Sequence, residues 1–270
     1  YLLDEYFDLL EQVNIREIQI TLDGPQAVHD QRRPHQSGKS TFGRIAANVT
    51  ECLKRGYPVN LRVVLDRENM DSLPQLAQYA IDQGWTSSPL FKTQLGRNYE
   101  LHYCQSTSQK LYSRLDMYQE LYQLLQQHPH IMEFHQPAYS VSRFLHQYQE
   151  LPQPLFDACP ACKSEWALDF RGGVYSCTAT VGKPGEELGT FYPELNLNQQ
   201  AIAQWQNRDV TLIEKCSTCN LQLACGAGCA SVAKNNHHTV LAPDCRPIKD
   251  LLEMGMKIYF EPTPSSDPVS

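Results

Sequence analysis

The chain has 270 residues and a net charge of −7, with 41% apolar and 20% charged residues. These values are typical of a globular protein that can bury an ordinary core. They argue against nucleic-acid binding, because no block of Lys and Arg offsets the negative charge. No apolar run approaches the roughly 20 residues that a membrane helix needs, and the acidic, amphipathic start is unlike a signal peptide. The chain begins at Tyr1 rather than Met, so we expect it to be a piece of a longer protein.

The first 90 residues alternate between helical and extended patterns. The expected elements begin with a helix over residues 1–13, a strand from Glu17 to Leu22, a polar loop from Pro25 to Lys39 and a helix that is capped by Ser40 or Thr41 and ends at Gly56. They continue with a strand from Val59 to Leu65, a helix that is capped by Asp71 or Ser72 and ends at Gly84, and a strand from about Thr86. This order predicts an α/β fold with a parallel sheet and right-handed crossovers, as half of a barrel or open sheet.

A helical period continues beyond this region. It predicts one helix over residues 110–128 and a shorter one over Ser140–Tyr148. Pro152 and Pro154 then interrupt regular structure, and we place a domain boundary at residues 151–156. The sequence ends in a polar, Pro-rich stretch that predicts a disordered tail.

The second part of the chain has few regular patterns. The stretch "WALDFRGGVYSC" predicts a β-hairpin around Gly172 and Gly173, and a loop and a short helix near Asn198–Gln206 follow. Such a segment has little apolar core of its own. Metal ligation is one way to stabilise it.

Cysteines are concentrated in this second part. Eight of the ten lie after residue 158: Cys159, Cys162, Cys177, Cys216, Cys219, Cys225, Cys229 and Cys245. Disulfide-dense chains are usually small and secreted, which argues against disulfides here. Cys52 and Cys104 lie in the first half, and we expect both to be small buried hydrophobic residues.

Close C-x2-C pairs allow two thiolates to bind one centre. The pairs Cys159/Cys162 and Cys216/Cys219 could complete one zinc site, which leaves four further cysteines for a second centre. A cubane iron–sulfur cluster also takes four cysteines. Spacing alone therefore leaves two zinc ions and two clusters open.

The full pattern runs from Cys162 through Gly172 and Cys177 to the block C-x2-C-x5-C-x3-C and a late Cys245. It closely resembles the SPASM domain of peptide-modifying radical SAM enzymes over about residues 155–250. The resemblance implies two auxiliary [4Fe-4S] clusters. Their implied ligands are Cys159, Cys162, Cys177 and Cys229 for the first, and Cys216, Cys219, Cys225 and Cys245 for the second. Because these sets interleave along the chain, we expect the two sites to fold as one unit.

The first half resembles the same family. "IQITLDGPQAVHDQRRP" is similar to the segment at the fourth barrel strand of these enzymes, and "VNLRVVLDREN" is similar to their fifth strand. The implied fold is the C-terminal part of a radical SAM (β/α)6 partial barrel over residues 1–150. A small, irregular, cysteine-rich SPASM domain with a β-hairpin follows over residues 155–250, and a helix end and tail complete residues 251–270.

The sequence departs from this family at two places. The radical SAM signature C-x3-C-x2-C is absent, because Cys225 and Cys229 are not followed by a third cysteine. We therefore expect this piece alone to lack the cluster that cleaves S-adenosylmethionine, and to be inactive. Thr178 follows Cys177 where sulfatase-maturating enzymes carry an aspartate that acts as a base, a role that a threonine hydroxyl ordinarily cannot take.

The implied function is radical modification of a ribosomally made peptide or protein by the intact cytoplasmic enzyme. Its cofactors would be S-adenosylmethionine, a third [4Fe-4S] cluster and the two auxiliary clusters, and its partners a peptide substrate and an electron donor such as flavodoxin or ferredoxin. Two alternatives stay open. One is sulfatase-type oxidation of Ser or Cys, and the other is a non-catalytic zinc-binding module.

By the same resemblance, four residues are candidates for binding S-adenosylmethionine. Thr21 and Asp23 lie at the end of a parallel strand, where ligands collect in such sheets. Arg44 and Arg62 could pair with its carboxylate, because a guanidinium fork suits that group. The alternative is that Thr21 is an ordinary strand residue, that Asp23 forms a turn and that the arginines are structural. The sequence identifies no catalytic residue.

Overall fold

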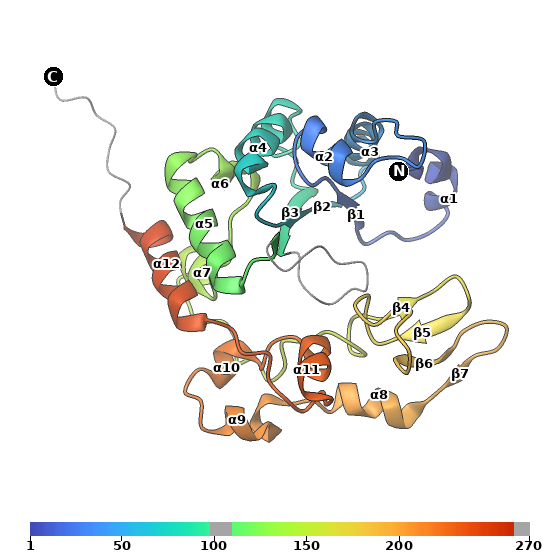
Figure 1. Ribbon diagram of the computed structural model, residues 1–270, viewed down its shortest axis with the longest axis vertical. Helices are drawn as coiled ribbons and strands as arrows, with labels where there is room; N and C mark the ends of the chain where they lie inside the picture. The colour runs from blue at the N-terminus through green and yellow to red at the C-terminus, as the bar shows by residue number, and fades with distance from the viewer. Residues whose placement is uncertain (98–109, 262–270) are drawn as a thin grey trace. The chain divides into compact units, whose positions relative to one another are not determined.

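The computed structural model describes residues 1–97 and 110–261, and these form two compact units (Figure 1). The first unit ends at Ala138 and the second begins at Tyr139. The sequence places its boundary later, and the assignment of functional domains to 1–150 and 155–250 stays a prediction. Cys104 and the expected disordered tail after Glu261 lie outside the described residues.

A three-stranded parallel sheet forms the centre of the first unit. Its strands are β1 (Ile18–Thr21), β2 (Val59–Leu65) and β3 (Phe91–Arg97), in the order β1-β2-β3. Thr21 pairs with Arg62 in the register of the sheet. The parallel pairing confirms the α/β class, since a helix-containing crossover joins each strand to the next.

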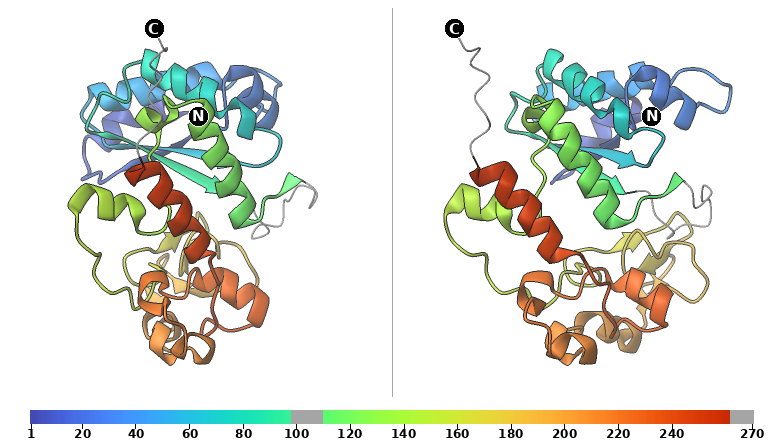
Figure 2. Two further views of the ribbon diagram at one scale, coloured as in Figure 1. Left: turned by 90° about the vertical axis from the view of Figure 1, so that its left-hand side faces the viewer. Right: turned by 60° about the vertical axis from the view of Figure 1, so that its left-hand side comes forward.

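The two faces of this sheet differ in chemistry. Helices α2 (Gln26–Arg32), α3 (Phe42–Lys54) and α4 (Leu73–Asp82) lie on one side (Figures 1 and 2). Alternate residues of β2 are buried and form the core with residues of α3 and α4: Leu61, Val63, Leu65, Val49, Cys52, Leu76, Ala77 and Ala80. Because side chains alternate along a strand, the other face carries mostly polar residues, namely Gln19, Thr21, Asn60, Arg62, Lys92 and Gln94.

The expected helix over residues 110–128 is present as α5 (Arg114–Gln127). The Ser113 side chain caps it by accepting a hydrogen bond from the backbone N–H of Asp116. The short helix α6 (Ile131–Phe134) follows and packs against α4.

Residues 1–13 do not form the single helix that the sequence predicts. A 3₁₀ turn over Leu3–Tyr6 leads into α1 (Phe7–Leu10), where the helix ends. Phe7 is buried, whereas Leu9 is 56% exposed. Most apolar residues of this segment therefore do not pack against a core. A short helix that lacks such packing is only marginally stable, so it does not continue to residue 13.

The expected polar loop from Pro25 to Lys39 is wrong in its first part, because this part forms α2. Pro25 immediately precedes the helix, where its fixed φ and missing N–H are tolerated. His29 is fully buried although the sequence around it is polar. Because α2 is polar and His29 is its one buried residue, the sequence shows no helical apolar pattern here.

Two boundaries also differ from expectation. Asp30 Oδ1, rather than the Ser40 or Thr41 side chain, caps α3 by accepting hydrogen bonds from two backbone N–H groups at 2.8 and 2.9 Å. β3 begins at Phe91 rather than near Thr86, because hydrogen-bonded turns precede it.

Helices α7 (Ser142–Tyr148) and α12 (Ile248–Phe260) pack together in the second unit. A Cβ added to Gly255 of α12 would lie 2.3 Å from Ser142 Oγ and 2.6 Å from Tyr139 Cβ. The close approach of the two helices therefore depends on this glycine.

The second unit also contains a four-stranded antiparallel sheet. Its strands are β4 (Ala167–Leu168), β5 (Gly173–Tyr175), β6 (Glu187–Thr190) and β7 (Asn196–Leu197), in chain order. The β4–β5 pairing confirms the expected hairpin, whereas β6 and β7 replace part of an expected loop. Gly172 has φ = 91°, and a Cβ there would lie 2.5 Å from the Tyr192 carbonyl oxygen. The turn between β4 and β5 therefore packs closely against the turn between β6 and β7 at this glycine.

Short helices surround the cysteines. They are α8 (Gln199–Gln206), which the sequence predicts, and α9 (Glu214–Ser217), α10 (Gln222–Cys225) and α11 (Ala230–His237), which it does not. The apolar clusters here are small and include four cysteines: Cys159, Cys162, Cys177 and Cys216. No helix in the described parts of the chain is long and apolar enough to cross a membrane.

Candidate metal centres and strand-end site

Three cysteines meet in the core of the second unit. Cys159, Cys162 and Cys177 are all buried within one cluster. Burial raises the pKa of Cys162 to about 12, and the neighbouring Cys177 adds to the shift. Burial also raises the pKa of Cys159 and of Cys177, and Cys229 is near enough to contribute to both. We call these four residues the first cysteine group.

Backbone hydrogen bonds join the segments that carry this group. The N–H of Cys162 donates to the carbonyl oxygens of Glu165, at 2.9 Å, and Ser176, at 3.2 Å. Ser176 directly precedes Cys177, so the bond ties the C-x2-C loop to β5 and its extension. Cys162 has φ = 58°, a left-handed conformation that turns the loop sharply.

The other four late cysteines line a single cavity of about 190 Å³. They are Cys216, Cys219, Cys225 and Cys245, which we call the second cysteine group. Burial raises the pKa of Cys216, and the charges of the three other cysteines raise it further. Apolar side chains, among them Val210, Leu221 and Ile248, complete the lining.

The donors of each group limit the kind of centre that it could hold. Within residues 1–97 and 110–261, no three His, Cys, Asp or Glu side chains are arranged to hold a single metal ion, and the nine described cysteines are free thiols. A tetrahedral zinc site needs sulfurs about 3.8 Å apart, given a Zn–S distance of about 2.3 Å. Each group does have the four thiols that a cubane takes. Neighbouring thiolates raise one another's pKa, so four ionise together only around a multivalent cation. This chemistry fits a metal centre such as an iron–sulfur cluster, and the role of the eight cysteines as ligands stays a prediction.

Thr178 has a carboxylate neighbour that the sequence did not indicate. Glu165 Oε1 accepts hydrogen bonds from the backbone N–H of Thr178, at 3.3 Å, and from its hydroxyl, at 3.5 Å. The sequence concealed this pair because the two residues are thirteen positions apart. A carboxylate thus lies next to the residue that replaces the expected aspartate.

Cys52 belongs to the first unit and is buried in α3. Burial raises the pKa of its thiol to about 11. It behaves as the small buried hydrophobic residue that the sequence predicts.

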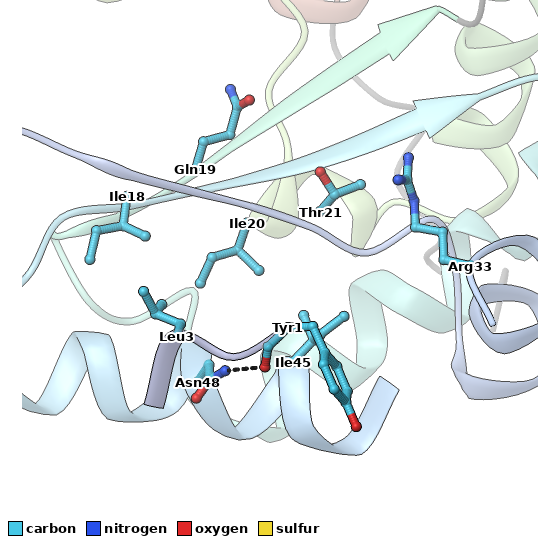
Figure 3. A pocket seen from close by; sticks show the side chains of 9 residues that line it. All are labelled: Tyr1, Leu3, Ile18, Gln19, Ile20, Thr21, Arg33, Ile45 and Asn48. Carbon is cyan, nitrogen blue, oxygen red and sulfur yellow. Dashed lines mark hydrogen bonds between the residues drawn. The ribbon is translucent and has the colours of Figure 1, made fainter. Parts of the chain in front are cut away.

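A second candidate site lies along β1. A cavity of about 340 Å³ lies beside this strand, and Figure 3 shows the side chains that line it. Its lining comes from β1, α3 and nearby segments: Tyr1, Leu3, Ile18, Gln19, Ile20, Thr21, Arg33, Ile45 and Asn48. Thr21 and Arg33 lie toward the same end of it (Figure 3), which is the carboxyl end of the strand, where ligands usually bind in parallel sheets.

Asp23 is engaged by its neighbours in the first unit. Its carboxylate accepts a hydrogen bond from the backbone N–H of Val64, at 3.0 Å, and pairs with Arg33, at 2.7 Å. Its carbonyl oxygen accepts from Asn69 Nδ2, at 2.7 Å, and its N–H donates to His29 Nδ1, at 3.2 Å. Asp23 thus ties together the ends of β1 and β2, and its contact with a cofactor stays a prediction.

The two candidate arginines have different surroundings. Arg44, on α3, pairs with Asp4 and Glu5 at 2.9 and 2.7 Å. Arg62 lies beside Thr21 on the polar face of the sheet, and its Nε is buried without a hydrogen-bond partner among the described residues. A buried donor without an acceptor is costly, and a carboxylate would satisfy it. The structure therefore brings Thr21 and Arg62 together and leaves Arg44 occupied elsewhere.

Sequence reasoning missed the polar network around these strand ends. Arg32 forms a bidentate pair with Asp66, at 3.0 and 2.9 Å. Asn69 Oδ1 accepts from the backbone N–H of Asp66, at 2.8 Å, and Asn69 Nδ2 also donates to the Val64 carbonyl oxygen. The available signal was the run of charged and amide residues just after each strand, in "LDGP" and "LDREN".

No family model and no curated protein matches the sequence. Solved structures match its fold. Native anSMEcpe with bound AdoMet aligns with a TM-score of 0.61 at 13% identity, covering 90% of this chain and 67% of that one. Native anSMEcpe with bound AdoMet and the Kp18Cys peptide gives a TM-score of 0.61 at 15% identity, with 90% and 68% covered.

The fold is similar to that of a radical SAM enzyme. AnSMEcpe is an enzyme of this class from the sulfatase-maturating group. At this level of identity the likeness establishes the fold alone. The chain spans about two thirds of the length of the anSMEcpe chains that it matches.

Proposed function

We propose that this chain is part of a radical SAM enzyme that modifies a ribosomally made peptide or protein. The observation that carries the proposal is the presence of two four-cysteine groups in a chain whose fold resembles that of an AdoMet-bound enzyme. In this proposal each group holds one auxiliary [4Fe-4S] cluster. A third cluster would need a C-x3-C-x2-C segment, which these 270 residues do not contain. The chain by itself is therefore expected to be inactive.

The first unit would bind the carboxylate of S-adenosylmethionine. This cofactor, when cleaved at the third cluster, would supply the radical that abstracts a hydrogen atom. Thr21 would donate one hydrogen bond, and Arg62 would add charge-assisted bonds from its fork. Asp23 and Asn69 would act indirectly by fixing the ends of β1 and β2. Such prior positioning lowers the entropic cost of binding in the reactive geometry.

The second unit would place its clusters so that they receive the electron left after the peptide is oxidised, or bind the peptide directly. The structures of anSMEcpe with the Kp18Cys and Cp18Cys peptides support a peptide as the class of substrate. An electron donor such as flavodoxin or ferredoxin belongs to the proposal, as does a cytoplasmic location, where thiols stay reduced.

Sulfatase-type oxidation of Ser or Cys is the second candidate. The likeness to anSMEcpe favours it, and so does the carboxylate of Glu165 beside Thr178. The two candidates differ in product, because sulfatase maturation yields an aldehyde from one residue and the leading proposal yields another radical modification, such as a crosslink. Mass spectrometry of peptides treated with the intact enzyme separates them.

The proposal is tested by iron and acid-labile sulfide content after anaerobic reconstitution of the chain. Two cubanes predict about eight iron and about eight sulfide per chain. C162S and C219S each remove one thiol, from the first and the second group respectively, and each should lose up to about four iron. C52S is the matched control, because Cys52 belongs to neither group, and it should keep the full content.

Zinc at about two per chain without sulfide would support the non-catalytic zinc-binding module instead. Full iron content in both C162S and C219S would contradict the ligand assignment. Loss of iron in C52S, with full content in the other two variants, would instead identify Cys52 of the first unit as a ligand.

A further inference from the structure

The side chain of Arg208, which follows α8, has no solvent exposure. A guanidinium has five N–H donors, and each of these has an acceptor. The acceptors are one carboxylate and four carbonyl oxygens: Asp157 Oδ1, Val240 O at 2.7 Å, Ala227 O at 2.9 Å, Ala242 O at 3.1 Å and Gly228 O at 3.5 Å. Burying a charge is costly unless it is paired and fully hydrogen-bonded, and Arg208 meets this condition.

Two of these acceptor segments carry cysteines of the first group. Asp157 precedes Cys159, and its Oδ1 also accepts a hydrogen bond from the Cys159 N–H, at 3.0 Å. Gly228 directly precedes Cys229. The guanidinium of Arg208 therefore connects both ends of the first group through adjacent backbone.

The same guanidinium holds segments of the second group. Ala227 follows Cys225 after one glycine, and Ala242 lies shortly before Cys245. The carbonyl oxygen of Ala227 accepts from both Arg208 and the backbone N–H of Asp244, at 2.9 Å for each bond. One buried side chain thus contacts ligand-bearing segments of both groups.

Arg208 shares its paired carboxylate with a second cation. Asp157 is the carboxylate that pairs with Arg208, and the other oxygen of Asp157 already accepts from Lys163 Nζ, at 2.6 Å. Two cations thus share one anion.

We propose that Arg208 is a positioning residue that couples the two cysteine groups. It holds the ligand-bearing segments of both groups and supplies positive charge to the clusters bound there. The inference rests on the proposed function, because it requires a cluster in each group. Positive charge near a cluster favours the reduced, more negative state, so the reduction potentials of both clusters should depend on Arg208 in the same direction.

The test compares two variants with the wild-type chain. R208M removes the buried positive charge and leaves Asp157 paired with Lys163, whereas R208K keeps the charge with fewer donors. Each protein is reconstituted anaerobically, its iron and sulfide are counted, its apo form is checked by circular dichroism, and its clusters are titrated by EPR-monitored reduction. We expect R208M to lose iron from both groups in parallel, and any clusters that remain to show lower potentials in both groups, because a positive charge is lost. R208K should recover most of the iron, with both potentials near those of the wild type.

K234M is the matched control. It removes another part-buried ion pair of the second unit, Lys234–Glu186 at 2.7 Å, from residues that are not ligands. Iron content and both potentials should stay at wild-type values in K234M. The coupling is overturned if R208M keeps full iron with unchanged potentials, if its changes are confined to one group, or if R208K binds no more iron than R208M. A wild-type chain without clusters would overturn the proposed function instead, so the two failures are distinguishable.

Discussion

Strand β2 of the first unit buries Leu61, Val63 and Leu65 beneath helices, whereas the described strands of the second unit have two to four residues each. The core of the second unit includes cysteines at four buried positions. Apolar burial thus stabilises the first unit directly. In the second unit, cysteine thiols and a buried arginine occupy core positions that aliphatic side chains occupy in the first unit.

This difference has a physical consequence. A buried aliphatic side chain stabilises a fold whatever the solution contains. Buried thiols with raised pKa values contribute little as thiols, but they release protons and gain strong bonds when a metal binds. We therefore expect the first unit to be stable by itself and the second to depend on its metal centres.

The largest expected effect is that of metal removal. An iron chelator added to the reconstituted chain should abolish most amide hydrogen-exchange protection in residues 155–248 and leave β2 and α3 protected, because only the second unit loses bonds. Protection in the second unit that is equal before and after chelation would contradict the comparison.

Leu61→Ala should have a large effect on the stability of the first unit. It leaves a cavity in the middle of β2 and should lower the free energy of unfolding of this unit by about 2–5 kcal/mol. Leu9→Ala, at an exposed position of α1, should change it by less than about 0.5 kcal/mol. Urea unfolding followed by hydrogen exchange of first-unit amides measures both. Equal effects would mean that β2 is not the core of the unit.

Gly255→Ala tests the packing of α7 against α12 in the second unit. The added methyl group would overlap with Ser142 and Tyr139, so we expect destabilisation of about 1–3 kcal/mol. Gly43→Ala is the control, because a Cβ there meets no atom within 4 Å, and it should stabilise α3 by about 0.4–1 kcal/mol. Thermal unfolding of the reconstituted chain compares the two, and a stabilising effect of Gly255→Ala would show that the helices separate easily.

The smallest expected effect is a pH dependence that comes from His29. Burial lowers the pKa of His29 from its ordinary value of 6.5, with the charge of Asp23 opposing the shift. Below about pH 6.5 the unfolded chain therefore binds a proton that the folded unit does not. The free energy of unfolding should fall as the pH drops from this value toward the lowered pKa, and then level off. Urea unfolding at several pH values measures the slope, and H29Q should remove it; the same slope in H29Q would assign it to another group.

Several local features could be predicted from the sequence. β2 has the bounds that its β-branched run predicts, and α3 ends just before Gly56, which has φ = 80°. The β4–β5 hairpin follows from the Gly172–Gly173 pair. These features depend on neighbours along the chain, which a sequence displays directly.

The missed features depend on distant partners. Asp30 caps α3 from another helix, and Asn69 joins the ends of two strands. Arg208 has no recognisable motif, because its partners are mostly carbonyl oxygens that any residue supplies. Glu165 likewise meets Thr178 only after the C-x2-C loop turns back.

Native mass spectrometry of the anaerobically reconstituted chain tests the central claim most directly. The account predicts a species that carries two units of four iron and four sulfide, and a C219S chain that carries one such unit. A mass gain of about two zinc ions without sulfide, or a single cluster that both C162S and C219S retain, would contradict it.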